Sequence, residues 1–216
     1  MTSQPSWPAL EHPARAPRRD AVQNYHRILD AARDLFGELG ADVGIEDIAA
    51  RAGVGIGTVY RRFASKDALV DELVRLATAE ITAAAGQALA RGDGHGLEDF
   101  LRAIGLSFAS HARYADLLLD RPADPEASRL IRAAIDQLTA RAIAAGTLNP
   151  NITACDIMVL IWGMRGVAQA CGEVAPTAWQ RYLDIHLAGL RAEGPLSSVP
   201  AMTATQLARL SPPAPR

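Results

Sequence analysis

The sequence predicts an all-α protein, and three observations support this. Helix-favouring Ala, Leu, Arg and Glu dominate the composition, whereas aromatic residues make up only 5% of it. Apolar residues recur at spacings of three and four, and no segment alternates like a strand for more than a few residues. Prolines gather near the two ends of the chain and are absent between Arg18 and Arg121. We therefore expect a helical middle between two flexible tails, residues 1–20 and 195–216.

The first predicted helix spans about residues 25–40, where a stripe of apolar side chains ends at Gly40. A short second helix covers 45–52, with Glu46 and Asp47 in the first turn, where the helix dipole favours anions. A third short helix covers about 56–63. Ser65 is the predicted N-cap of a long fourth helix that ends near residue 90.

Further helices follow a break at GDGHG, residues 92–96. They are predicted at about 97–112, 114–120, 126–145, 154–171 and 176–191. Thr153 and Asp156 have the spacing of a capping box, and Pro176 suits the first turn of the last long helix. The segment TATQLARL near the C-terminus predicts one more short helix.

Several classes of protein are disfavoured. A net charge of −2 excludes a generally polycationic nucleic-acid binder, although a local basic face remains possible. The first twenty residues lack the apolar core of a secretory signal, and no apolar run approaches a membrane span, so we expect a cytoplasmic protein with no membrane partner. Cys155 and Cys171 would lie about 24 Å apart on one helix, too far for a disulfide. They are either buried thiols in a reducing cytosol or residues with a redox or cross-dimer role.

The sequence lacks the patterns of a catalytic or metal-binding protein. Its five histidines include no HxxxH pair, its two cysteines form no CxxC motif, and it has no GxSxG, P-loop or dinucleotide-binding motif. We therefore expect no catalytic residues, no metal and no cofactor.

The stretch GVGIGTVYRRFASKDAL, residues 53–69, carries the functional signal. Two short helices joined by a tight turn, the second rich in Arg and hydroxyl groups, are typical of a helix-turn-helix. Ile48 and Ala49 on the first helix would pack against Val59 and Phe63 on the second. Gly53 would supply the left-handed turn between them.

The second helix of this pair has a polar face opposite its apolar seam. Gly57 costs about 1 kcal/mol relative to Ala inside a helix, and it is useful where the backbone must approach DNA closely. The other candidate DNA-binding residues are Thr58, Tyr60, Arg61, Arg62 and Lys66, the last being the only lysine in the chain. Tyr60 and Lys66 suit phosphate contacts, because Lys66 begins a helix whose N-terminal amides also attract anions.

The segment IEDIAARAGVGIGTVYRRFASKDALVDEL resembles the DNA-binding signature of the TetR family of bacterial regulators, and the likeness covers about residues 24–74. The resemblance implies a three-helix DNA-binding domain, here 21–66, and a helical ligand-binding and dimerisation domain, here 67–194. It also implies that Gly57, Thr58, Tyr60, Arg61, Arg62 and Lys66 contact DNA. The fourth helix would link the domains, and the last two long helices would pair with a second subunit.

The chain departs from the family pattern at two places. Gly44 stands where a phosphate-contacting Ser or Thr is usual, and Asp42 is an alternative helix cap. Gly55 and Ile56 replace a usual Ser-Lys pair; Ile56 either touches a thymine methyl group or packs inward. Separately, Arg15, Arg18 and Arg19 form either an arm for the minor groove or a solvated tail.

The helix predicted at 154–171 is apolar on nearly every side and must be covered all round. We expect this helix and the one after it to form a four-helix dimer interface with the same two helices of a second subunit. Gly163 and Gly166 would allow the helices to approach closely there. The alternative is that both helices belong only to the core of their own chain. The residues expected at the dimer interface are Trp179, Tyr182, Leu183, His186, Leu187 and Leu190.

A ligand pocket is implied by the resemblance. Its candidate lining residues, each of which could equally be ordinary core, are Phe100, Ile104, Phe108, His111, Leu118, Met158, Trp162 and Arg165. Arg165 would either neutralise an acidic ligand or pair with an acid across the dimer.

The sequence thus predicts a homodimeric repressor that binds a near-palindromic double-stranded DNA operator and responds to an unknown small-molecule effector. The alternatives are a helical interaction module with impaired DNA binding and a small all-α enzyme.

Overall fold

The computed structural model describes residues 17–119, 121, 124–172, 174–191 and 193–210. It confirms the all-α class, since these residues include no strand. The helices are α1 (Pro17–Leu39), α2 (Ile45–Ala52), α3 (Ile56–Arg62), α4 (Lys66–Ala90), α5 (Gly96–His111), α6 (Ala115–Leu119), α7 (Pro125–Ala144), α8 (Ala154–Cys171), α9 (Ala178–Leu190) and α10 (Ala204–Leu210). Two single 3₁₀ turns, η1 (Gly40–Asp42) and η2 (Ala112–Tyr114), follow α1 and α5.

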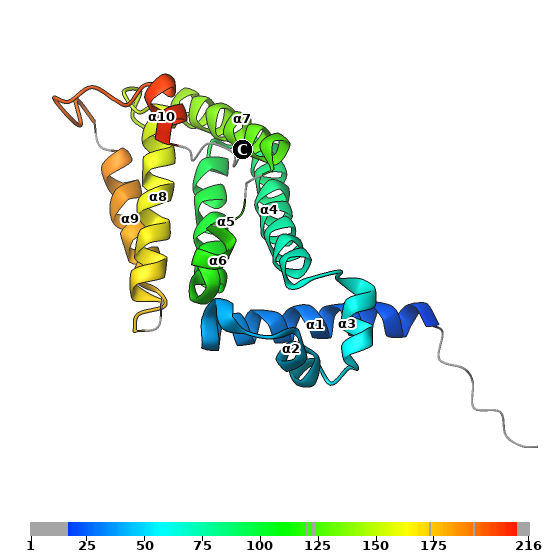
Figure 1. Cartoon of the computed structure of the whole chain (residues 1–216). Helices are drawn as coiled ribbons and strands as arrows, with labels where there is room; N and C mark the ends of the chain where they lie inside the picture. Colours follow the sequence, from blue (N-terminus) through cyan, green and yellow to red (C-terminus); the bar gives the residue numbers. More distant parts are fainter. Residues whose placement is uncertain (1–16, 120, 122–123, 173, 192, 211–216) are drawn as a thin grey trace, which may run out of the picture.

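The helices form two groups. Figure 1 shows α1 lying across the base of a bundle made by α4, α5, α7, α8 and α9, with α2 and α3 packed against α1. One cluster of buried side chains, the N-terminal cluster, contains residues of α1, α2 and α3. The first half of α4 contributes Leu69, Val70 and Leu73 to the same cluster. A second cluster fills the bundle and includes Ala85 and Ala88 from the other half of α4. The single helix α4 therefore packs into both groups.

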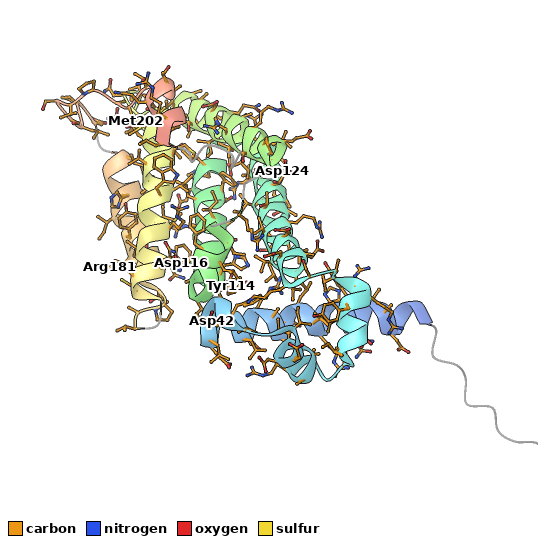
Figure 2. The ribbon with its side chains drawn as sticks, viewed as in Figure 1. Asp42, Tyr114, Asp116, Asp124, Arg181 and Met202 are labelled. Atoms are coloured by element: carbon orange, nitrogen blue, oxygen red, sulfur yellow. The ribbon has the colours of Figure 1, made fainter. Side chains whose placement is uncertain are left out.

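The junction between the groups is sealed by η2 and α6. Tyr114 is buried in the N-terminal cluster, and Leu117 and Leu118 pack against the same cluster. Figure 2 places Tyr114 where the base of the bundle meets α1. The N-terminal cluster is thus completed by residues that lie far along the chain.

The predicted caps at Ser65 and Thr153 are confirmed. The Ser65 hydroxyl accepts a hydrogen bond from the Ala68 amide at 3.1 Å. Thr153 and Asp156 form the expected capping box of α8. Asp124 also caps α7, with Pro125 in the first turn, so this helix begins about one residue before the predicted start.

Two further boundaries differ from the sequence prediction. Helix α1 begins at Pro17 rather than near Tyr25, because a first-turn proline and Asp20 favour a start there. Arg18 and Arg19 therefore belong to a helix and not to a tail, whereas Arg15 lies outside the described residues. Pro176 precedes the N-cap of α9, Thr177, instead of lying in its first turn.

The segment expected as a C-terminal tail contains the predicted short helix, now α10. Its Leu207 is buried, which ties α10 to the rest of the protein. In Figure 1 this helix is drawn at the upper end of the bundle.

Helix α8 is long and apolar enough to cross a membrane, judged by length and composition alone. It instead packs against α5, α7 and α9 as a helix of the bundle. Yet only 28% of its 18 residues are buried within the chain. Cys155 and Cys171, both on α8, are half-buried free thiols.

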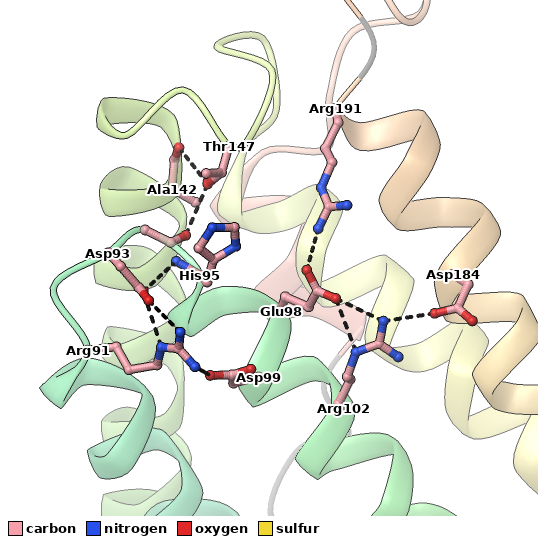
Figure 3. A network of polar contacts seen from close by, with 11 residues as sticks. Arg91, Asp93, His95, Glu98, Asp99, Arg102, Ala142, Thr147, Asp184 and Arg191 are labelled. Carbon is pink, nitrogen blue, oxygen red and sulfur yellow. Dashed lines mark hydrogen bonds and ion pairs between the residues drawn. The ribbon is translucent and has the colours of Figure 1, made fainter.

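A network of charged side chains connects α5 with α9 (Figure 3). Arg102 bridges Glu98, at 2.8 Å, and Asp184 on α9, at 2.9 Å. Arg191, which follows α9, also pairs with Glu98. Each such surface pair contributes about 0–1 kcal/mol, so the network adds little to the stability of the fold.

Candidate nucleic-acid interface and effector cavity

Helices α2 and α3 form a helix-turn-helix. Ile48 and Ala49 on α2 are buried with Val59 and Phe63, as the sequence predicted. Gly53 adopts a left-handed conformation with φ of 62°, and its amide bonds to the Ala50 carbonyl at 3.1 Å. The turn therefore needs glycine because an L side chain is strained at that φ.

The outer face of α3 is open to solvent. Gly57 is exposed, and no atom lies within 4 Å of the place where a Cβ would be. Tyr60, Arg61 and Arg62 are also exposed. Among the described residues, none comes close enough to position 57 to require glycine there.

The side chains of this face are held in place by neighbours. Arg61 donates to the hydroxyl of half-buried Thr58 at 3.1 Å. The Arg62 guanidinium lies 4.6 Å from the ring centroid of Tyr25 on α1, a cation–π contact. A surface cavity of about 320 Å³ separates these helices; it is lined by Asp20, Ala21, Asn24, Tyr25, Ile28, Thr58, Arg61 and Arg62.

Lys66 lies at the start of α4, as predicted, and is half-buried. Its ammonium group donates to the carbonyl of Ala41 in η1. An ammonium has three donors, so this bond positions Lys66 and leaves capacity for a further acceptor.

The departures from the family pattern have structural outcomes. Gly44 is the N-cap of α2 and offers no side chain; instead Asp47 accepts a hydrogen bond from its amide at 3.2 Å. Asp42 ends η1, so the alternative that it caps α2 is wrong. Ile56 is 42% exposed and does not pack inward.

The residues predicted to line a ligand pocket are scattered through the bundle. Phe100 and Ile104 are buried in its core, and Phe108 and Met158 pack against that core. Leu118 packs against the N-terminal cluster instead. Trp162 and Arg165 are half-buried on α8, and no described residue forms an ion pair with Arg165.

His111, another predicted pocket residue, lies at the junction between the two groups of helices. Its Nδ1 is 3.4 Å from the Ser107 hydroxyl, and its ring meets Tyr114 edge-on. Burial lowers the pKa of His111, Arg33 on α1 acts in the same direction, and Glu80 on α4 opposes it. Since burial is the largest of these effects, the surroundings of His111 favour its neutral form.

A cavity of about 660 Å³ opens between α4 and the start of α7. It is lined by Asp71, Val74, Arg75, Thr78, Ala79, Thr82, Ala83, Arg121, Asp124 and Ala127. None of the eight predicted pocket residues is among them. The volume lies in the range of small-molecule sites.

Sequence reasoning also missed the polar link beside this cavity. Arg75 forms two hydrogen bonds to Glu72, at 2.7 and 2.8 Å, and the Tyr25 hydroxyl donates to the same carboxylate. The only signal in the sequence was the Glu-x-x-Arg spacing, which is common on solvated helices. Nothing in it indicates Tyr25, which lies 47 residues away.

The residues on α9 that were predicted for the dimer interface differ in burial. Trp179, Leu183 and Leu187 are buried within the chain itself. Tyr182 and Leu190 are half-buried, and exposed His186 bonds through Nδ1 to the Tyr182 carbonyl at 2.7 Å.

The two glycines expected to admit a partner helix also differ from each other. Gly163 allows close approach within the chain, since a Cβ there would overlap the Tyr182 hydroxyl. Gly166 faces open space.

The chain matches two family models. Residues 28–73 match the bacterial regulatory proteins of the tetR family, and residues 92–192 match the C-terminal domain of SbtR-like transcriptional regulators. A 53-residue segment is 42% identical to the HTH-type transcriptional regulator SAB2452 of Staphylococcus aureus; it covers 24% of this chain and 29% of that protein.

Solved structures match over most of the chain. A TetR transcription regulatory protein from Mycobacterium vanbaalenii is 31% identical, with a TM-score of 0.59 over 81% of this chain and 99% of that one. The TetR transcriptional regulator SCO0520 from Streptomyces coelicolor is 28% identical, with a TM-score of 0.59 over 78% of this chain and 99% of that one. Together with the helix-turn-helix geometry, these matches show that the chain belongs to the TetR family of transcriptional regulators, and that it is a DNA-binding protein and not an enzyme.

Proposed function

We propose that the chain is a ligand-responsive repressor that binds a near-palindromic operator as a homodimer. The observation that carries this proposal is the exposed face of α3, where an unconstrained Gly57 lies among exposed Tyr60, Arg61 and Arg62. Residues 21–66 would form the DNA-binding domain, and residues 67–194 the sensing and dimerisation domain.

In this proposal α3 enters the major groove. Arg61 and Arg62 can each donate two parallel hydrogen bonds to a guanine, and exposed Ile56 can touch a thymine methyl group. Tyr60 and Lys66 would contact phosphates and so fix the register. Thr58 supports Arg61 through their hydrogen bond.

The proposed dimer surface is the outer face of α8 with the exposed side of α9. An apolar helix with only 28% of its residues buried needs further cover. Val159 on α8 is 42% exposed and Ile185 on α9 is 57% exposed, while Gly166 faces open space. A second subunit, bound through the same surface, would cover these residues together with Tyr182, His186 and Leu190.

Two subunits paired in this way would present two α3 helices about 34 Å apart, one turn of DNA. An effector that favours a different spacing would release the DNA. A coupling free energy of about 1–3 kcal/mol corresponds to a 5- to 150-fold loss of affinity.

The test is fluorescence anisotropy of labelled DNA from the region flanking the protein's own gene, at two salt concentrations. We expect saturable, sequence-selective binding that weakens steeply as salt rises. Arg61→Ala should weaken it by about 1–3 kcal/mol. Arg132→Ala, which removes an exposed arginine of α7, is the matched control and should change little.

Binding of wild-type protein that is no tighter to this DNA than to a scrambled sequence, and hardly dependent on salt, would count against the regulator. It would favour a helical interaction module whose helix-turn-helix does not bind DNA.

A further inference from the structure

One carboxylate, that of Glu72, lies between the cavity and the DNA-reading helix. On one side it receives two hydrogen bonds from Arg75, a residue of the cavity wall. On the other side it accepts a hydrogen bond from the Tyr25 hydroxyl. The Arg62 guanidinium lies over the ring of the same tyrosine. The Glu72 side chain is only 20% exposed, so it has little water to replace a lost partner.

The surroundings of Glu72 and Tyr25 favour an ionised carboxylate and a protonated phenol. Chiefly through the hydrogen bonds from Arg75, the pKa of Glu72 falls to about 2, with Tyr25 and the charge of Arg62 acting in the same direction. Burial, followed by the bond to Glu72, raises the pKa of Tyr25. At neutral pH an ionised Glu72 therefore accepts from a protonated Tyr25, within electrostatic reach of Arg62.

The cavity wall indicates the chemistry of a ligand. Its body is made of small apolar and methyl-bearing side chains, namely Val74, Thr78, Ala79, Thr82, Ala83 and Ala127. Arg75 and Arg121 supply guanidinium groups, which bind carboxylates through paired hydrogen bonds. Both acids of the wall have partners, since Asp124 caps α7 and Asp71 pairs at 3.5 Å with Arg121, which also pairs with Asp67. Arg121 is thus already neutralised, and Arg75 is the guanidinium on which the choice of an anionic ligand rests.

We propose that this cavity binds a small anionic molecule with an apolar body. Binding of this molecule to Arg75 would change the position of Arg62 through Glu72 and Tyr25. The inference rests on the proposed function, because it names the ligand class and the internal route of that regulation.

The route works by competition for one guanidinium. A carboxylate bound in the cavity draws Arg75 away from Glu72. The partly buried Glu72 then lacks its main counter-ion and attracts Arg62 more strongly. Arg62 is withdrawn from the DNA, so the ligand weakens operator binding.

The first test needs no ligand. Arg75→Ala removes the counter-ion permanently, and we expect it to weaken operator binding by about fivefold or more. Adding Glu72→Gln to Arg75→Ala should restore most of the affinity, because the charge that captures Arg62 is gone. Arg129→Ala is the matched control, since Arg129 pairs with Glu126 three residues before it on α7, as Arg75 does with Glu72.

Circular dichroism and the thermal midpoint of each variant separate a loss of fold from a loss of coupling. An Arg75→Ala protein that is folded and binds DNA like wild type overturns the route. So does a double variant that is folded but no better than Arg75→Ala.

The second test uses decanoate as the probe, with decanol and decylamine as uncharged and cationic matches. Calorimetry should show that decanoate binds at least about tenfold more tightly than either match, and that Arg75→Gln removes this preference. Tyr25→Phe should bind decanoate as wild type does, yet release DNA at least about threefold less in response. Absent decanoate binding, or tighter binding of decylamine, overturns the ligand class.

The calorimetry requires no DNA, so its result stands even if the wild-type protein binds no operator. A wild-type protein that binds no operator would count against the proposed function, whereas a failure to bind decanoate would count only against the ligand class.

Discussion

The indole ring of Trp179 on α9 lies directly against the backbone of Gly105 on α5. A Cβ placed on Gly105 would overlap the ring, and it would also lie 2.9 Å from the sulfur of Met164 on α8. Three helices of the bundle thus meet at one glycine. Their close packing explains why an otherwise helix-disfavouring residue stands in the middle of α5.

Gly105→Ala should destabilise the protein by about 1–3 kcal/mol, because the added methyl group must displace the buried Trp179 or separate the helices. Urea unfolding measures this free energy, and tryptophan fluorescence should shift in the native state. Gly86→Ala on α4 is the matched control. Gly86 is exposed and no atom lies within 4 Å of the place where its Cβ would be, so that change should stabilise the protein by up to about 1 kcal/mol. Equal effects at both sites would contradict the packing argument.

Gly57→Ala should separate stability from function. No side chain of the described residues lies within 4 Å of the place where a Cβ on residue 57 would be, so the folded protein should gain up to about 1 kcal/mol from better helix propensity. If the α3 backbone lies against DNA, the same methyl group should reduce operator affinity by about tenfold or more. Urea unfolding and anisotropy measure the two quantities. Unchanged affinity would remove Gly57 from the interface, and Gly86→Ala should leave affinity unaltered.

Much of the architecture was predictable from local pattern. The bounds of α2 match the prediction, and the caps at Ser65 and Thr153 were read from spacing alone. Such features depend on neighbouring residues. The start of α1 was missed because a proline-rich sequence favoured a tail, although Pro17 and Asp20 are themselves signals of a helix start.

Features that depend on tertiary structure were less accessible. Periodicity showed that one stripe of α9 is buried, but it cannot show whether the cover comes from the same chain or from a partner. Trp179 lies on that stripe and is covered by α5 and α8. The cavity escaped detection because it arises where small residues such as Ala79 and Ala83 leave space, and a sequence pattern reports side chains rather than gaps.

Val159→Glu combined with Ile185→Glu should convert a dimer into monomers, because two like charges per subunit would be buried against their symmetry mates. Size-exclusion chromatography with light scattering measures the mass. Leu130→Glu is the control, since Leu130 is similarly exposed but lies on α7. A double variant that stays dimeric would place the interface elsewhere.

His111 should make stability depend on pH. Burial lowers its pKa below the ordinary 6.5, so the unfolded chain takes up a proton before the folded one does. The stabilisation from a neutral, buried His111 is fully present above that ordinary value and is lost as pH falls below it. Wild-type protein should therefore lose more stability between pH 7 and pH 5 than His111→Gln, measured by urea unfolding at each pH. Parallel curves for the two proteins would show that His111 makes no such contribution.

The length of α4 has a mechanical consequence. Its 25 residues run without a break from Lys66, next to α3, to Ala90 at the far end of the bundle. A helix of that length is about 37 Å long, so a tilt of about 5° at one end displaces the other by about 3 Å. One half of α4 is packed into the N-terminal cluster and the other half into the bundle, so a tilt of this helix changes the position of one group of helices relative to the other. If α3 reads DNA as proposed, a ligand that tilts α4 by a few degrees would move α3 out of register with the groove.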